Sequence, residues 1–224
     1  MNTRISWYFS GEFIKLVSIK TIIYQNPNNG PTEMSALQLI YQHPLLSAED
    51  VNTIINAHKK VYFRKGDYLL KKDQVAKMYF CVEKGLIRSY VYDFEGNDIT
   101  TGFVGENELA IDVISLFHGI PAVEYFQALT DCECYSIPFN DFQVLYHSIK
   151  GFNEWGRAWM SGNLFELKQR TISMITDSAS ERYKTLRSRH PQILQQSPLK
   201  YIASYLGITD TSLSRIRKEL VRES

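Results

Sequence analysis

Cysteine is scarce in this chain, and long hydrophobic runs are missing from it. Only three cysteines occur among 224 residues, Cys81, Cys132 and Cys134, and their odd number gives no disulfide framework. The longest early apolar stretch, residues 13–24, contains two lysines and is too short to span a bilayer. No segment resembles a cleaved secretory signal. We therefore expect a reduced, cytoplasmic location and no membrane span.

The motifs of common enzymes are also lacking. The five histidines are scattered with no His-x-His pair, and neither a Walker-type glycine loop nor a Gly-x-Ser-x-Gly elbow occurs. Three cysteines are too few for an iron–sulfur cluster with four thiolate ligands. We expect no catalytic residue, no metal and no cofactor, although a histidine ligand to haem and a redox or metal pair of Cys132 and Cys134 stay open. Two buried small side chains are the simpler interpretation of that pair.

What the chain does contain is typical of a globular protein, because 44% of its residues are hydrophobic and 22% are charged. The formal net charge of +1 hides an uneven distribution along the chain. Residues 1–180 hold 16 basic and 20 acidic side chains, whereas residues 181–224 hold 9 basic and 4 acidic ones. An acidic body is thus joined to a basic tail with a charge of +5, which is suited to a polyanionic partner.

The pattern of apolar and turn-forming residues changes several times along the chain. Residues 1–33 end in a run of turn formers, so we expect either a poorly ordered extension with a translation start at Met34, or a docking strand around residues 7–9. Short helices are expected between Leu37 and His58, with a helix start at Ser47. Short runs interrupted by glycine follow and predict a compact β domain. These runs are Val61–Phe63, Tyr68–Leu70, Met78–Val82, Leu86–Tyr92, Ile99–Val104 and Tyr125–Ile137.

After Pro138 the apolar period becomes helical. One set of apolar or small residues is spaced four and three apart, which is the pattern of a coiled-coil seam. A second apolar face lies beside it, so the helix needs two partners: its own β domain and either the same helix of a second subunit or another part of the same chain. The seam residues are Met160, Leu164, Leu167, Thr171 and Met174.

The last segment predicts a helix-turn-helix. Ala203 is the small residue where two helices cross, and Gly207 supplies the sharp turn. Ile202, Leu206, Ile208, Leu213 and Ile216 would close a small core, and Thr209 would cap the second helix. An ordinary helical hairpin with a charged outer face is the alternative. We expect DNA contacts from Thr209, Asp210, Thr211, Ser212, Ser214, Arg215, Arg217 and Lys218.

With these features, residues 34–220 resemble the cyclic-AMP receptor protein and FNR superfamily of bacterial transcription regulators. The resemblance is carried by residues 200–209 and 213–217, which follow the β pattern and the seam helix. It implies an α+β chain with a cyclic-nucleotide-binding-like β-roll (jelly roll), a homodimer formed through the long helix, and recognition helices on a palindromic operator. The family's base-contacting arginine falls on Arg215, while two other contact positions hold Asp210 and Thr211, so the family's operator is not expected to carry over.

The resemblance also implies where a nucleotide would bind. The family's Gly-Glu-Leu-Ala turn reads Asn107, Glu108, Leu109 and Ala110 here, and the arginine that neutralises the cyclic phosphate falls at about Ala122, beside Val123. No Arg or Lys occurs between residues 89 and 149, and a buried phosphate without a cation is strongly unfavourable. We expect the usual cyclic-AMP binding to be lost, while a different effector in a remodelled pocket stays open.

The sequence therefore predicts a dimeric transcription regulator that binds double-stranded DNA, is not an enzyme and responds to an unknown small-molecule effector. RNA polymerase is a candidate further partner. We expect an extension at residues 1–33, a sensor domain at 34–148, a dimerisation helix at 149–177 and a DNA-binding domain at 178–224. The family's β-hairpin wing is expected to be missing, because only Pro191–Ser197 precedes the motif. A ligand-binding or scaffold protein with a vestigial helix-turn-helix, or a cupin-type metal enzyme, is the alternative.

Overall fold

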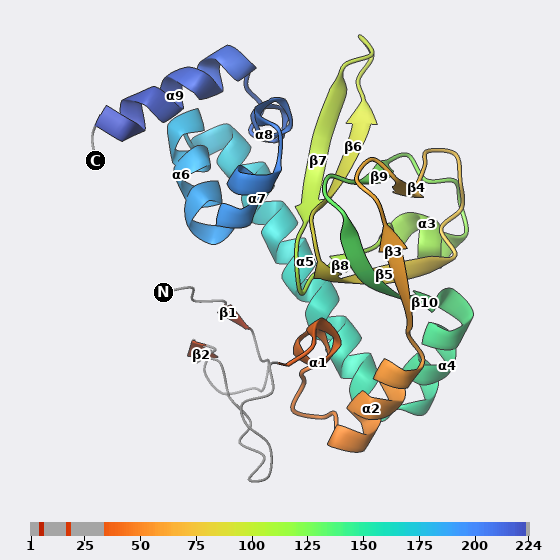
Figure 1. Ribbon diagram of the computed structural model, residues 1–224. Coiled ribbons are helices and arrows are strands. Elements are labelled where there is room, and N and C mark those ends of the chain that lie inside the picture. The colour runs from red at the N-terminus through yellow and green to blue at the C-terminus, as the bar shows by residue number, and fades with distance from the viewer. Residues whose placement is uncertain (1–4, 7–16, 19–33, 223–224) are drawn as a thin grey trace.

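The computed structural model describes residues 5–6, 17–18 and 34–222 (Figure 1). The two short N-terminal segments, β1 (Ile5–Ser6) and β2 (Val17–Ser18), pair antiparallel. The other expectations for residues 1–33, an unordered extension or a docking strand at residues 7–9, lie outside the described residues.

Two short helices precede the β domain, as the sequence predicted. These are α1 (Ala36–Ile40) and α2 (Ala48–Asn56). Each begins with a capping box, in which a serine side chain and the residue three positions later satisfy each other's backbone N–H groups. Ser47 is the N-cap of α2, and its Oγ accepts a hydrogen bond from the Asp50 backbone N–H at 3.1 Å. The predicted helix start at Ser47 is confirmed.

The β domain is a roll of two four-stranded antiparallel sheets. One sheet has the order β3-β10-β5-β8 and the other β4-β9-β6-β7. The predicted single run from Tyr125 to Ile137 is two strands, because residues 129–131 turn the chain from one sheet into the other. The strands are β3 (Lys59–Phe63), β4 (Tyr68–Leu70), β5 (Met78–Lys84), β6 (Ile87–Tyr92), β7 (Asp98–Val104), β8 (Leu109–Ala110), β9 (Tyr125–Ala128) and β10 (Cys132–Pro138).

The interior of the roll is apolar and contains all three cysteines. Cys132 and Cys134 lie two apart on β10 and are both buried with Phe80, Val82 and Ile87 between the two sheets. Cys81 is buried in a second cluster, where α1, α2 and the helices after the roll cover its base. The cysteines therefore pack as small apolar residues, and none forms a disulfide.

The rest of the described chain is helical. A short helix, α3 (Val113–His118), crosses between the sheets' ends and stops at Gly119, whose φ of 65° suits a left-handed C-cap. No strand occurs among the described residues after Pro138, so the structure has no β-hairpin wing there. The remaining helices are α4 (Phe139–Ser148), α5 (Lys150–Thr176), α6 (Ala179–Arg189), α7 (Pro191–Gln196), α8 (Leu199–Tyr205) and α9 (Asp210–Arg222).

Helix α5 connects the two ends of the molecule (Figure 1). Its 27 residues correspond to about 40 Å, from the base of the roll to the C-terminal helices. Its first turns are buried against the roll through Phe152 and Trp155, and the Trp155 indole N–H donates to the Ile40 carbonyl at 2.8 Å. The predicted seam on its other face is exposed, with Leu164 at 67% and Leu167 at 59%. In the described chain this apolar face has no covering partner.

Candidate nucleic-acid interface

Helices α8 and α9 form the predicted helix-turn-helix. Ala203 is fully buried where they cross, and the Ile208 backbone N–H donates to the Ala203 carbonyl at 3.0 Å across the turn. Gly207 makes this turn with a φ of 68°, a region that L side chains rarely adopt. Ile202, Leu206, Leu213 and Ile216 are buried in one core, while Ile208 packs at its edge.

Thr209 caps the second helix as predicted. Its Oγ1 accepts a hydrogen bond from the Ser212 backbone N–H at 3.2 Å, which satisfies a donor that the first turn leaves open. The Thr209 hydroxyl also donates to Ser212 Oγ at 3.0 Å, and Ser212 is half-buried. Ser212 therefore hydrogen-bonds to the cap residue Thr209, whereas its polar neighbours on α9 lie on the exposed outer face.

The outer face of α9 is polar, basic and exposed. Arg215 is the most prominent cation at its centre, with 76% of its side chain exposed. Its Nε lies 3.9 Å from Glu219 Oε1, a contact too long and too exposed to hold the guanidinium in place. The other predicted DNA-contacting residues that the structure leaves exposed are Thr209, Asp210, Thr211, Ser214, Arg217 and Lys218.

An arginine that the sequence analysis did not single out positions the turn. Arg182 on α6 donates from Nε and Nη2 to the Leu206 carbonyl at 3.3 and 2.8 Å, and from Nη1 to the Asp177 carbonyl at 2.6 Å. It joins the end of α8 to the link between α5 and α6. No periodic pattern marks such a contact, because both acceptors are backbone carbonyls.

Residues 107–110, where the resemblance implies an effector site, cover the end of the turn between β7 and β8 of the roll and strand β8 itself. Asn107 has a φ of 63°, so asparagine occupies the left-handed position that glycine holds in the family motif. Its backbone N–H donates to the Val82 carbonyl at 2.8 Å. Glu108 Oε2 accepts a hydrogen bond from the Gly105 backbone N–H at 2.9 Å, so this carboxylate supports its own loop.

The residues expected opposite this turn give it no positive charge. Ala122 is buried, and its backbone N–H and C=O pair with the loop at residues 73–74. Val123 points outward and is 68% exposed. A cavity of about 190 Å³ does lie between the sheets, but of the five expected pocket residues only Ala110 lines it. Its walls are mostly apolar, including Leu69, Leu70 and Phe126.

Glu124 and Arg170 interact electrostatically near this turn. Glu124 is half-buried, and burial raises the pKa of its carboxyl, while Arg170 on α5 opposes this shift. The Arg170 guanidinium lies 4.3 Å from the centroid of the Tyr205 ring, and its Nη2 donates to the Tyr205 carbonyl at 3.2 Å. Burial also raises the pKa of the Tyr205 phenol. The arginine that acts on Glu124 thus comes from α5 and is engaged by α8.

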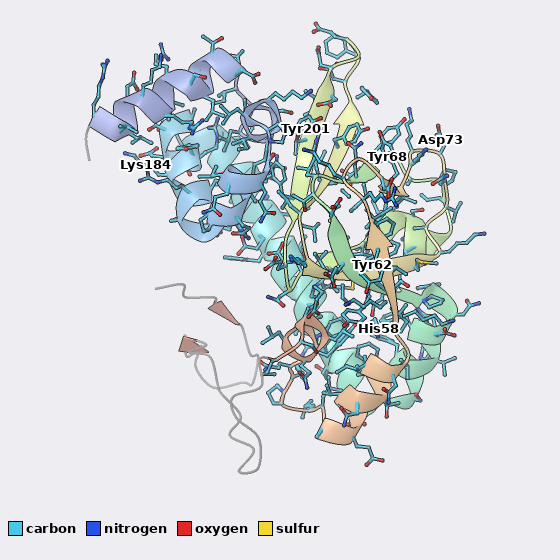
Figure 2. All side chains as sticks on the ribbon, in the orientation of Figure 1. His58, Tyr62, Tyr68, Asp73, Lys184 and Tyr201 are labelled. Carbon is cyan, nitrogen blue, oxygen red and sulfur yellow. The ribbon has the colours of Figure 1, made fainter. Side chains whose placement is uncertain are left out.

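The same helix α8 packs directly on the β-roll (Figure 2). Arg88 on β6 is fully buried, and its guanidinium lies between the rings of Tyr90 and Tyr201, at 4.2 and 3.6 Å from their centroids. Its Nη2 forms an ion pair with Asp98 at 2.7 Å, without hydrogen-bond geometry. Tyr201 therefore covers a charge that belongs to the β-roll.

Backbone contacts extend this junction along β7. The Thr100 backbone N–H donates to Ser204 Oγ at 2.8 Å, and the Ser204 hydroxyl donates to the Asp98 carbonyl at 3.4 Å. Phe103 and Tyr205 pack edge to face, with their centroids 5.3 Å apart. Leu86 and Leu129 of the roll join the same apolar cluster as α6, α7 and α8. The C-terminal helices and the roll thus share a continuous interface.

The described part of the chain meets neither the ligand requirement of a metal site nor the length and hydropathy requirement of a membrane-spanning helix. No group of three or more His, Cys, Asp and Glu side chains there could hold a metal ion. None of the helices in the described ranges is both long and apolar enough to cross a bilayer.

Comparison with known proteins supports this architecture. Residues 60–148 match the family described as cyclic nucleotide-binding domain. Electron transport regulator A of Shewanella oneidensis is 25% identical over 182 residues, which cover 75% of this chain and 70% of that protein.

Two solved structures share the fold. FixK2 from Bradyrhizobium japonicum aligns with a TM-score of 0.63 and 17% identity, over 74% of this chain and 85% of that one. A transcriptional regulator of the CRP/FNR family from Eubacterium rectale aligns with a TM-score of 0.61 and 16% identity, over 81% of this chain and 88% of that one. The resemblance seen in the sequence, and the fold class that it implied, are confirmed.

Proposed function

We propose that this chain, a relative of the CRP/FNR transcription regulators whose residues 60–148 match the cyclic nucleotide-binding domain family, regulates transcription by binding a specific DNA sequence as a homodimer. The observation that carries the proposal is the exposed face of α9 on a closed helix-turn-helix core. Short polar side chains and arginine are the groups that read base edges and bind phosphates. Because its partner is chromosomal DNA, we expect the protein in the cytoplasm.

The proposed division of labour follows the elements. Residues 34–148 would form the sensor, 149–177 the dimerisation helix and 178–224 the DNA-binding domain. The exposed seam of α5 would bury itself against the same seam of a second subunit. Two recognition helices would then enter successive major grooves about 34–36 Å apart on a palindromic operator. RNA polymerase would be a further partner of the DNA-bound dimer.

We propose that the sensor does not bind cyclic AMP in the usual way. The position of the phosphate-neutralising arginine holds buried Ala122, and the nearby half-buried group is the Glu124 carboxyl. Arg170, whose charge acts on Glu124, already contacts Tyr205. A cyclic phosphate beside Ala122 would therefore meet the Glu124 carboxylate, while Arg170 is already engaged. Isothermal calorimetry should detect no cyclic-AMP binding below about 1 mM, and micromolar binding would refute this part of the proposal.

A signal in the β-roll would reach DNA through the junction with α8. The contacts of Arg88 with Tyr201 and of Thr100 with Ser204 hold the first helix of the DNA-binding motif on the sensor. A ligand that moved β6 or β7 would shift the balance between dimers whose recognition helices fit the operator spacing and dimers whose helices do not.

Selection from a pool of random duplexes tests the DNA-binding proposal. The purified protein should enrich a palindromic sequence, and Arg215→Ala should lose the preference at one base pair of each half-site, a loss of about 1–3 kcal/mol for that contact. Arg157→Ala is a matched control, since Arg157 is an exposed arginine on α5 that pairs with Glu154 away from α9. A wild-type selection without any enriched sequence would favour a ligand-binding or scaffold role with a vestigial helix-turn-helix.

A further inference from the structure

A cavity of about 560 Å³ lies between α6 and α9. Tyr183 and Arg187 line it from α6. Ser214, Arg217, Lys218 and Arg222 line it from α9. Its floor is apolar and includes the buried Leu220, so the arginine stems can lie on carbon while their guanidinium groups reach water.

All the charged residues that line this cavity are positive. Four of its lining residues are cations, Arg187, Arg217, Lys218 and Arg222, and none is acidic. No ion pair formed within residues 34–222 includes any of these four, whereas nearby Arg189 pairs with Glu166 and Arg215 approaches Glu219. Like charges gathered in a concave surface repel each other and raise the local concentration of anions. The cavity is therefore set up for a negatively charged partner.

The helical positions place this cavity beside the base-reading face. Ser214, Arg217, Lys218 and Val221 are three and four residues apart and share one flank of α9. Arg215 lies on the neighbouring face, and Lys218 borders both. An α-helix with its side chains is about 10–12 Å across and the major groove of B-DNA is about 12 Å wide, so the flanks of an inserted helix lie close to the bordering phosphates.

The form of the cavity favours a DNA strand over a small anion. All four cations are exposed at its rim, where a single free phosphate would keep most of its water. A phosphodiester backbone can instead meet several of them in succession and release its own counterions. Residues 139–222 form no β-hairpin wing that could contact the backbone, and α6 can supply such contacts from this side.

We propose that the α6–α9 cavity binds the sugar–phosphate backbone that borders the major groove, with Arg187 as the phosphate ligand contributed by α6. This inference rests on the proposed DNA-binding function and adds a second element to it. Arg187 sets affinity and salt dependence without reading bases, while the α9 face around Arg215 reads the sequence.

The test measures binding of a short fluorescent duplex of arbitrary sequence by anisotropy at several salt concentrations. Arg187→Gln removes one phosphate contact from each subunit, so it should lower the slope of log K against log salt by about 0.9 per subunit, or about 1.8 for the dimer, and should weaken binding several-fold at low salt. Lys184→Gln is the matched control, since Lys184 is an exposed cation on the same helix that does not line the cavity (Figure 2). Thermal unfolding of both variants checks that they fold.

The outcomes separate the inference from the function on which it rests. An unchanged slope for Arg187→Gln, or the same loss in both variants, would overturn the site. Tight binding of inorganic pyrophosphate that depends on Arg187 without any effect on duplex binding would also overturn it, in favour of a small-anion site. If the duplex binds through Arg187 but no operator is ever selected, the site stands and sequence-specific regulation fails. If the wild-type chain binds no duplex, both fail.

Discussion

The guanidinium carbon of Arg88 lies 3.6 Å from the centroid of the Tyr201 ring, so a strand of the β-roll and the first helix of the DNA-binding motif enclose one buried cation. Arg88 has its ion pair with Asp98 and a second ring, Tyr90, on its sensor side. Tyr201, on α8, is the residue of the C-terminal helices that covers this guanidinium. The stability of the chain and the placement of its recognition helix therefore depend on the same contact.

Removing the Tyr201 ring should destabilise the whole chain. Tyr201→Ala opens a gap over the Arg88 guanidinium and should lower the free energy of unfolding by about 2–3 kcal/mol. Tyr201→Phe keeps the ring over the cation and should change it by less than about 1 kcal/mol. Urea unfolding of the full chain measures both. Equal losses for the two variants would show that the hydroxyl, and not the stacked ring, is what matters.

The Glu124 carboxyl should make stability depend on pH. Burial raises its folded pKa above the ordinary 4.5, so the folded chain holds this proton more tightly than the unfolded chain does. Stability therefore falls as the pH rises from about 4.5 through the folded pKa. Glu124→Gln should raise the melting temperature relative to wild type at pH 7, and this gain should disappear near pH 4. The exposed Glu106→Gln serves as control, and a gain independent of pH would contradict the argument.

The exposed seam of α5 should hold two subunits together. Leu164→Glu places a charge in the middle of the proposed contact and should weaken the dimer roughly a hundredfold or more. Val144→Glu is the control, because Val144 on α4 is equally exposed at 67% but lies outside the seam. Sedimentation equilibrium measures both. A Leu164→Glu protein that dimerises like wild type would place the subunit contact elsewhere.

The three cysteines should be inert in the folded protein. Burial raises the pKa of Cys81 and of Cys134 to about 12, and it raises that of Cys132 as well. Since the thiolate is the reactive form, iodoacetamide at pH 8 should modify none of them in the native chain and all three in denaturant. Mass spectrometry counts the adducts. Rapid native labelling at Cys132 or Cys134 would revive a redox role for that pair.

Sequence patterns predicted the helix-turn-helix and the strands of the roll, because these elements depend on residues that are close together in the chain. The helix-turn-helix could be identified from Ala203 and Gly207, because both the crossing and the turn impose a residue type at a fixed spacing. The strands of the roll followed from short apolar runs between glycines. Ala122, the position at which the resemblance implies a phosphate-binding arginine, is buried in the structure.

Contacts between distant segments could not be predicted in this way. In the sequence, Arg88 looks like an ordinary strand residue and Tyr201 like a surface residue of a helix, but the fold places the Tyr201 ring over the Arg88 guanidinium. The contact of Arg170 with Tyr205 could not be predicted either, because the two residues are far apart in the sequence. The break within Tyr125–Ile137 was missed because residues 129–131 carry no glycine or proline, and the turn is fixed instead by the Leu129 backbone N–H bonding to the Leu86 carbonyl.

The junction at Arg88 limits how freely this chain could exchange parts with its relatives. A β-roll expressed without the helices after α5 would expose a cation that is normally enclosed, together with the unpaired Thr100 backbone N–H. A chimera that received another protein's helix-turn-helix would need an aromatic ring at position 201 and a hydroxyl at position 204 to restore the junction. Substitutions at the β6 and β7 positions of this junction should therefore require matching substitutions on α8.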